Sequence, residues 1–190
     1  MARYGMSINL TTCVACDACV VACKMENNVP DGYARDWTEE VVRDNYPNLK
    51  AELYSSRCQH CENAPCVSAC PTKASHIVNG IVLVDKELCV GCEHCISACP
   101  YGARYLHPDK YVDKCTFCHH RLDTGRLPAC VEICPTRSLV FGDLDDPKSA
   151  VSKALKKRDY KVLKPLKGTV PKYFLIKSII KREDLSDDTE

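Results

Sequence analysis

The spacing of the cysteines constrains what this chain can fold into more than any other feature. Sixteen cysteines occur in 190 residues, about one residue in twelve, far more than a packed hydrophobic interior uses. In "CVGCEHCISACP", residues 89–100, two residues separate each of the first three cysteines, a fourth follows after three more, and a proline comes next. Aligned on their last two cysteines, four segments match: "CVVACKMEN" (19–27), "CVSACPTKA" (66–74), "CISACPYGA" (95–103) and "CVEICPTRS" (130–138). This internal repeat indicates one kind of site built several times.

Disulfides, zinc and haem each account for part of this pattern. A disulfide scaffold is typical of secreted chains, but "MARYGMSINLTTC" at the N-terminus lacks a signal-peptide pattern. Zinc knuckles place their second cysteine pair about a dozen residues after the first, a spacing that only the last segment satisfies. The stretch "CTFCH" (115–119) matches the c-type haem rule, although haem would remove two ligands from that segment. We therefore expect His119 and His120 to be surface groups or neighbours of a site.

Iron–sulfur clusters account for all four segments together. The first and third segments reproduce the C-x2-C-x2-C-x3-C run of bacterial ferredoxins, and the second widens one gap to four residues. In that run three closely spaced thiolates hold three corners of an iron–sulfur cube, and the fourth cysteine ligates the neighbouring cluster. The tetrads are complete: Cys13, Cys16, Cys19, Cys23; Cys58, Cys61, Cys66, Cys70; Cys89, Cys92, Cys95, Cys99; and Cys115, Cys118, Cys130, Cys134. The pattern predicts four 4Fe-4S clusters.

Because fourth ligands are exchanged, the motifs must pair. Asn79-Gly80, between two apolar runs, is a strong hairpin signal and joins motifs two and three. It predicts an inner ferredoxin-like unit over residues 55–110. By elimination motifs one and four form an outer unit, residues 1–54 with 111–142. The predicted fold class is α+β, with two nested bacterial-type ferredoxin-like units, β-hairpin insertions, and a C-terminal helix and extended tail.

The segments outside the motifs carry weaker signals. Residues 24–57, with Pro30, Gly32, Pro47 and many charges, suggest an irregular excursion with little regular structure. Within the C-terminal part, "TRSLVFGDL" (136–144) predicts a strand, and "DDPKSAVSKALKKRD" (145–159) predicts a helix with Asp146 as N-cap. Residues 143–190 are expected to form that helix and an extended tail, with a frayed acidic end, "REDLSDDTE".

Several functions are excluded by what the sequence contains. A net charge of +1 with dispersed Lys and Arg argues against nucleic acid as a partner. The longest apolar runs, such as "IVLV" (81–84), are too short to span a bilayer. No nucleotide or flavin motif is recognisable, and no tetrad lacks a ligand, so we predict no catalytic residue. Binding four oxidised cores would take the net charge to about −7. The chain is expected to carry electrons rather than to catalyse a reaction.

Runs beyond the cysteines carry a resemblance to a known family. "CKMENNVP", "CQHCENAPCV", "CPYGARYLHP", "KCTFCHHRL", "PACVEICPT" and "FGDLDDPKS" resemble the four-cluster electron-transfer subunit, the B subunit, of the complex iron–sulfur molybdoenzyme family. The likeness is closest to polysulfide and thiosulfate reductases. It implies four ligand sets, each with three cysteines from one motif and the fourth from its partner. The sets are Cys13, Cys16, Cys19 and Cys134; Cys115, Cys118, Cys130 and Cys23; Cys58, Cys61, Cys66 and Cys99; and Cys89, Cys92, Cys95 and Cys70.

The resemblance also implies partners and a location. The first cluster would lie nearest a molybdopterin catalytic subunit and the fourth nearest an integral-membrane subunit that handles quinol or quinone. Because Cys92 is retained, the fourth cluster is expected to be 4Fe rather than 3Fe. Such complexes usually lie on the outer, periplasmic face of the cytoplasmic membrane, and this chain would be exported together with its catalytic partner. The absence of a signal-peptide pattern fits a cytoplasmic complex equally. The alternatives are oxidoreductases acting on arsenic oxyanions, tetrathionate or dimethyl sulfoxide, a free-standing ferredoxin, and a zinc-binding interaction module.

Overall fold

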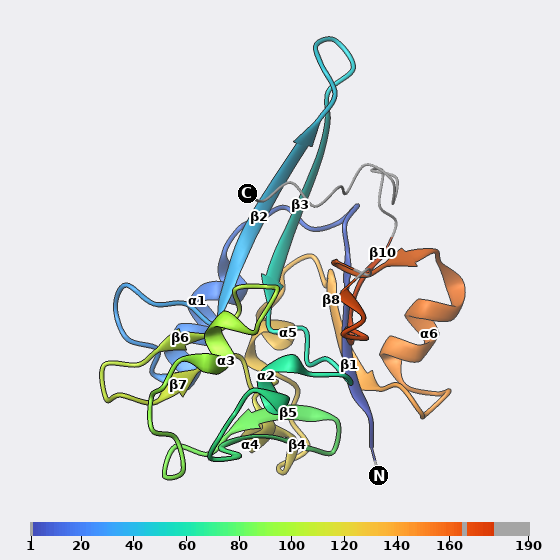
Figure 1. Ribbon diagram of the computed structural model, residues 1–190. Coiled ribbons are helices and arrows are strands. Elements are labelled where there is room, and N and C mark those ends of the chain that lie inside the picture. Colours follow the sequence, from blue (N-terminus) through green and yellow to red (C-terminus); the bar gives the residue numbers. More distant parts are fainter. Residues whose placement is uncertain (1, 165–166, 177–190) are drawn as a thin grey trace.

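A four-stranded mixed sheet brings residues 4–9 together with strands from residues 139–176. The computed structural model describes residues 2–164 and 167–176. The sheet has the order β8-β1-β10-β9, formed by Leu139–Asp143 (β8), Tyr4–Asn9 (β1), Tyr173–Ile176 (β10) and Tyr160–Lys161 (β9). Strand β1 pairs antiparallel with β8 and parallel with β10 (Figure 1). Within the expected extended tail, residues 160–161 and 173–176 are therefore strands of the central sheet. The acidic end "REDLSDDTE" lies outside the described residues.

The core of the sheet is apolar on successive strands. Met6 and Ile8 on β1 and Tyr173 and Leu175 on β10 are fully buried. They pack with Phe141 of β8 and with several motif cysteines in one cluster of buried side chains. The sheet thus anchors the cysteine-bearing loops to the rest of the chain through shared hydrophobic burial, the dominant favourable term in folding.

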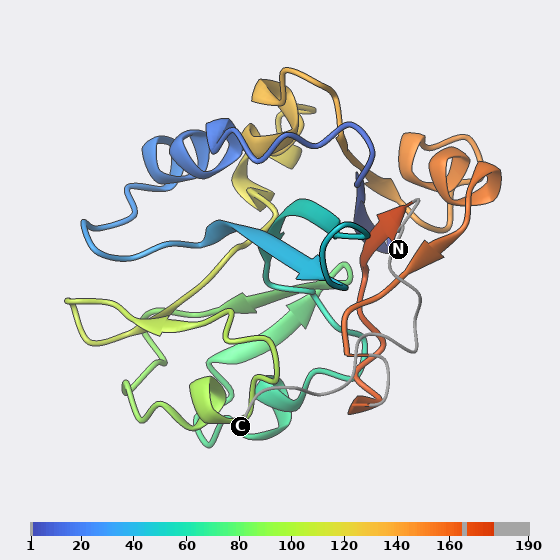
Figure 2. The ribbon, with the colours of Figure 1, turned by 90° about the horizontal axis from the view of Figure 1, so that it is seen from above.

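Short helices accompany the motifs, and the third cysteine of each motif, Cys19, Cys66, Cys95 or Cys130, lies in one of them. They are α1 (Ala18–Asn27), α2 (Pro65–Ser68), α3 (His94–Ser97), α4 (His119–Leu122) and α5 (Ala129–Ile133). Helix α1 packs against α5, and α2 packs against α3. Figure 2 shows the first pair on one side of the molecule and the second pair on the other. The helices of motifs one and four are therefore neighbours, as are those of motifs two and three.

Two small hairpins accompany motifs two, three and four. Strands β4 (Ser75–Val78) and β5 (Ile81–Val84) pair antiparallel. Asn79 and Gly80 connect them with φ of 48° and 74°, the left-handed conformation that a type I′ turn requires at both positions. The predicted Asn-Gly hairpin is confirmed. A second hairpin pairs β6 (Tyr105–Leu106) with β7 (Val112–Asp113).

The prediction of an irregular excursion over residues 24–57 is wrong. Strands β2 (Asp36–Arg43) and β3 (Lys50–Arg57) pair in register from Asp36 opposite Arg57 to Arg43 opposite Lys50. They form a long hairpin that projects from the body (Figure 1). Pro30 and Gly32 lie before β2 and Pro47 lies in the connecting loop, so these residues bound the strands instead of breaking them. The strands were concealed because most of the side chains that they bury are polar or charged: Asp36, Glu52, Ser55, Ser56 and Arg57.

The C-terminal helix is present but begins later than predicted. The strand expected over 136–144 is confirmed as β8, and α6 spans Ala150–Lys157 with Ser149, not Asp146, as N-cap. Asp146 instead forms a preceding turn, accepting from the Lys148 backbone N–H at 2.8 Å. Ser149 Oγ accepts from Ser152 N at 3.2 Å and donates to the Asp143 carbonyl at 2.6 Å. These bonds tie the start of α6 to β8.

Candidate iron–sulfur sites

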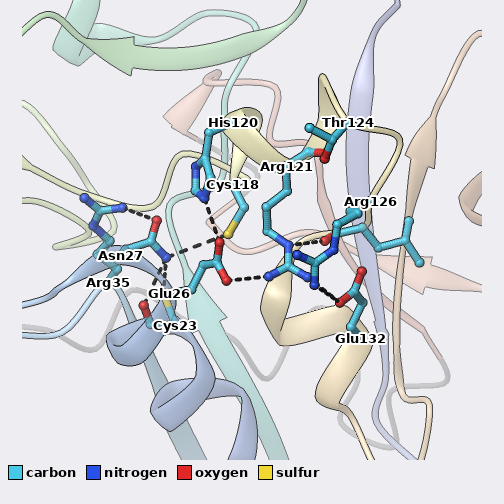
Figure 3. A network of polar contacts seen from close by, with 11 residues as sticks. Cys23, Glu26, Asn27, Arg35, Cys118, His120, Arg121, Thr124, Arg126 and Glu132 are labelled. Carbon is cyan, nitrogen blue, oxygen red and sulfur yellow. Dashed lines mark hydrogen bonds and ion pairs between the residues drawn. The ribbon is translucent and has the colours of Figure 1, made fainter.

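One cavity brings together cysteines from the first and fourth motifs. Its lining includes Cys23, which lies in α1, and Cys130, which lies in α5. Cys115 and Cys118, from the loop before α4, also line it. The Asn27 side-chain amide lies 3.7 Å from both Cys23 Sγ and Cys118 Sγ, so the two sulfurs face the same group (Figure 3). The four thiols come from residues far apart in sequence, and they are the predicted second ligand set.

A second cavity gathers cysteines from the second and third motifs. Cys70 of the second motif lines it together with Cys89, Cys92 and Cys95 of the third motif. Of these, Cys95 lies in α3. Backbone N–H groups point at two of these sulfurs: Val112 N lies 3.3 Å from Cys89 Sγ, and Ser75 N lies 3.4 Å from Cys70 Sγ. Such donors are typical of the surroundings of iron–sulfur thiolates. This group corresponds to the predicted fourth ligand set.

A third group of thiols shares one electrostatic environment. The pKa of Cys61 is raised to about 12, chiefly by burial and also by the thiols of Cys58, Cys66 and Cys99, against a hydrogen bond to Thr169 that lowers it. Burial also raises the pKa of Cys66, with Cys58 and Cys99 again contributing. Cys99 belongs to the third motif, whereas the other three belong to the second. The grouping matches the predicted third ligand set.

The remaining cysteines lie where the N-terminal loop meets the turn after α5. Thr12 Oγ1 lies 2.8 Å from Ser138 Oγ, which lies 2.6 Å from Thr136 Oγ1. Thr136 Oγ1 is in turn 3.7 Å from Cys134 Sγ. Cys13, Cys19 and Cys134 pack against the same hydrophobic core, while Cys16 is exposed. The loop of the first motif and the fourth cysteine of the last are therefore neighbours.

The buried thiols fit a group that takes them as thiolates. Burial raises the pKa of Cys115 and of Cys130 to about 12, and the Arg57 guanidinium is the largest opposing influence on both. Iron binds thiolates and displaces their protons, so binding four-iron cores would remove the cost of burying these sulfurs without partners. No disulfide links any of the sixteen cysteines. Over residues 2–164 and 167–176, no three His, Cys, Asp or Glu side chains converge closely enough to hold a single metal ion.

The internal repeat is visible in the atoms around two of the closing cysteines. Cys70 and Cys134 are each followed by Pro-Thr, and the threonine hydroxyl lies 3.7 Å from the cysteine sulfur in both cases. Burial acts to raise the pKa of Cys70, but hydrogen bonds from Ser75 and Thr72 outweigh it and the pKa is lowered. The pKa of Cys134 is lowered in the same way, by donors that include the Leu139 backbone. Both turns favour the thiolate form.

Sequence reasoning missed the buried cations beside the thiols. Arg57 Nη1 lies 2.7 Å from Cys130 Sγ, and Arg104 Nη2 lies 2.9 Å from Cys66 Sγ. Lys114 is buried beside Cys115 and donates to the Cys115 carbonyl at 2.7 Å. The only local signal is that Arg57 and Lys114 directly precede the first cysteines of their motifs. Nothing in the spacing pairs Arg104 with Cys66.

A polar network supports the cavity that Cys23 and Cys118 line. Arg35 binds both carboxylate oxygens of Asp113 at 2.8 Å and donates to Asn27 Oδ1 at 2.8 Å. Asn27 in turn faces the two sulfurs (Figure 3). Arg35 and Asp113 are both buried, so the bidentate pair fixes the orientation of Asn27. His119 and His120, the candidates beside "CTFCH", are exposed, and His120 Nε2 lies 2.8 Å from Glu26 Oε1.

No helix in residues 2–164 or 167–176 has the length and apolar character needed to cross a membrane.

Comparison with known proteins agrees with this chemistry. Residues 49–144 match the family described as "4Fe-4S dicluster domain", and residues 12–74 match a second family of the same description. Protein NrfC of Escherichia coli is 45% identical over 92% of this chain and 80% of the relative. The B subunit of polysulfide reductase from Wolinella succinogenes is 45% identical over 92% of this chain and 94% of its own length. The thiosulfate reductase electron transfer subunit PhsB of Salmonella typhi is 48% identical over 76% of this chain and 78% of its own.

These matches decide between the kinds of cysteine site. The two family matches together span residues 12–144 and include all four motifs, overlapping over residues 49–74. They therefore support iron–sulfur clusters without dividing the chain into units. Because this chain is 45% identical to NrfC and to the polysulfide reductase B subunit over 92% of its length, its similarity to them is not confined to the cysteine motifs. The chain therefore belongs to the 4Fe-4S dicluster family and is an iron–sulfur electron-transfer subunit homologous to the B subunit of polysulfide reductase and to the thiosulfate reductase electron transfer subunit.

Proposed function

We propose that this chain passes electrons through four 4Fe-4S clusters between a membrane quinol or quinone subunit and a molybdopterin catalytic subunit. When bound, each cluster accepts and donates one electron, and the protein positions the clusters and sets their potentials. The ligand sets are the four implied by the family resemblance. The complex is of the polysulfide or thiosulfate reductase type and lies on the outer face of the cytoplasmic membrane, where the catalytic subunit carries this chain.

The observation that carries the proposal is the continuity of the four thiol groups. Cys19 of the first set and Cys130 of the second both interact electrostatically with Arg57. Cys58 of the third set is close enough to Cys115 of the second to act on its pKa. Arg104 acts on Cys66 of the third set and on Cys95 of the fourth. Consecutive sets are therefore adjacent, as electron transfer through a series of clusters requires.

The two ends of this series are the exposed ones. Cys16 in the first set and Cys92 in the fourth are the two exposed cysteines. Val21 and Met25, four residues apart, present an apolar face on α1, the helix that contains Cys19 of the first set, and Met25 is 77% exposed. Leu88, next to the fourth set, is 51% exposed. Exposed apolar residues at both ends support a partner protein at each end.

Purification of the tagged chain with its neighbours tests this function. We expect a molybdenum-containing subunit and a membrane subunit to co-purify, and pre-reduced clusters of the complex to be oxidised by polysulfide or thiosulfate. The chain alone, loaded with clusters, should reduce neither compound. Oxidation by arsenate, tetrathionate or dimethyl sulfoxide instead would favour the alternative oxidoreductases. Purification without any molybdenum subunit would contradict the proposal and favour a free-standing ferredoxin.

Two variants test whether the two partner subunits bind at opposite ends of the cluster series. Met25→Glu should reduce recovery of the molybdenum subunit and leave the membrane subunit attached, because a charge replaces an exposed apolar contact on α1. Leu88→Glu should have the opposite effect, so each variant is the matched control for the other. Iron content should be unchanged in both. Equal loss of both subunits in either variant would contradict the proposal that the molybdenum subunit binds near Met25 and the membrane subunit near Leu88.

A further inference from the structure

Three buried cations occupy the gaps between consecutive thiol groups. Arg57 lies between the first and second sets, where it acts on Cys19 and donates to Cys130 Sγ. Lys114 lies between the second and third sets and acts on Cys115 and Cys58. Arg104 lies between the third and fourth. Loading the sites adds negative charge throughout this interior, so these cations sit where that charge is greatest.

The two arginines differ in how their charge is neutralised. Arg57 pairs with the Asp36 carboxylate at 2.9 Å, and both side chains are buried. Arg104 differs: Nη1 donates to Ser75 Oγ at 2.8 Å and Nη2 to Cys66 Sγ at 2.9 Å. Its Nε has no hydrogen-bond partner. Across residues 2–164 and 167–176, no carboxylate forms an ion pair with Arg104.

Arg104 also reaches both neighbouring sites. It interacts electrostatically with Cys66 and Cys58 of the third set and with Cys95 of the fourth. Its exposed fraction is 5%, so water screens this interaction little. A guanidinium keeps its proton in proteins, so the charge does not depend on ambient pH.

We propose that Arg104 sets the reduction potentials of the third and fourth clusters together, raising both through its unneutralised positive charge. The inference rests on the proposed ligand sets. Each reduction adds one negative charge to a cluster, and a nearby buried cation stabilises that charge. A hydrogen bond to a ligating sulfur acts in the same direction. Arg57, paired with Asp36, would exert a smaller net effect on the first two clusters.

Redox titration of the cluster-loaded protein followed by EPR tests the proposal. In Arg104→Gln, the ratio of reduced to oxidised cluster at a fixed potential should fall at least about tenfold for two centres, or about 59 mV for a one-electron couple. Those two centres should be the ones that Cys61→Ala and Cys92→Ala individually remove. In Arg104→Lys, which keeps the charge, most of the shift should be absent.

A second variant tests the charge without removing the arginine. Ser75→Asp places a carboxylate against Nη1, giving Arg104 the kind of partner that Asp36 provides for Arg57. It should lower the same two potentials even if Arg104→Gln does not retain its iron. Arg121→Gln is the matched control, because the Arg121 side chain is also buried but its hydrogen-bond partners are Glu26, Glu132 and the Leu127 carbonyl rather than a cysteine sulfur. It should move no potential by a comparable amount.

The outcomes separate this inference from the proposed function. If Arg104→Gln and Ser75→Asp each retain four centres with the reduction potentials of the unchanged protein, the inference about Arg104 is wrong. The proposed function would be unaffected by that result. An equal shift in Arg104→Lys and Arg104→Gln would also overturn the inference, because the effect would then come from packing and not from charge. Fewer than four centres in the unchanged protein would contradict the proposed function, and the inference with it.

Discussion

Replacing Cys134 by alanine is expected to abolish the same EPR signal as replacing Cys16, although the two residues belong to the last and the first motif. The proposed reciprocal ligation makes Cys134 the fourth ligand of the N-terminal cluster. The hydrogen-bonded series from Thr12 through Ser138 and Thr136 to Cys134 supports this arrangement. Alanine is preferred to serine because a hydroxyl oxygen could still bind iron. The measurement is EPR of the reduced, anaerobically purified protein.

The reciprocal pair provides the control. Cys23→Ala should abolish the signal that Cys118→Ala abolishes, because both thiols line one cavity and face Asn27. The two pairs of variants should therefore lose two different signals, and each should retain the other three centres. If the signal lost in Cys134→Ala matches the one lost in Cys118→Ala, motif four ligates a cluster on its own and the reciprocal assignment is wrong.

Replacing Asp113 by asparagine is expected to lower the free energy of unfolding by about 3–5 kcal/mol, the cost of leaving one member of a buried ion pair without its partner. Arg35 binds both oxygens of Asp113 at 2.8 Å, and the two side chains are 9% and 8% exposed. The variant should also disturb Asn27, which Arg35 orients toward the sulfurs. Anaerobic guanidinium titration, followed by far-UV circular dichroism and by cluster absorbance, measures both effects.

A carboxylate in the neighbouring loop serves as the control for that experiment. The Asp109 side chain lies between β6 and β7 and is 77% exposed, so Asp109→Asn should change stability by no more than about 0.5 kcal/mol. Replacing Arg35 and Asp113 together by Met and Leu should recover much of the lost stability, because no unpaired charge remains. An Asp113→Asn variant as stable as Asp109→Asn would show that the pair contributes no net stability.

The cysteine motifs were accessible from the sequence because their chemistry depends on local spacing. In motifs one and three, three thiols within seven residues must curl around one group, and the repeated "CPT" turns place Thr72 and Thr136 at the same distance from their cysteines. The Asn79-Gly80 turn was predictable for the same reason, since both residues adopt positive φ readily.

Long-range features were not accessible in this way. The β2–β3 hairpin was missed because its buried positions are largely polar or charged, as at Asp36, Glu52 and Arg57, so no apolar alternation marks the strands. The parallel pairing of β1 with β10 joins segments far apart in the sequence, and no local pattern specifies it. The helix start was misplaced because aspartate and serine both suit an N-cap, and here it is Ser149 Oγ that accepts the helix N–H, from Ser152. The bond from Ser149 to the Asp143 carbonyl, which no local pattern specifies, holds that residue in place. Arg104 reaches Cys66 through tertiary packing alone.

The most direct test of the account is the iron and acid-labile sulfide content of the anaerobically purified chain. Sixteen cysteines arranged in four shared sets predict sixteen irons and sixteen sulfides per polypeptide, with four distinguishable one-electron centres. Twelve or fewer irons in fully loaded protein, or zinc in place of iron at the last motif, would contradict it.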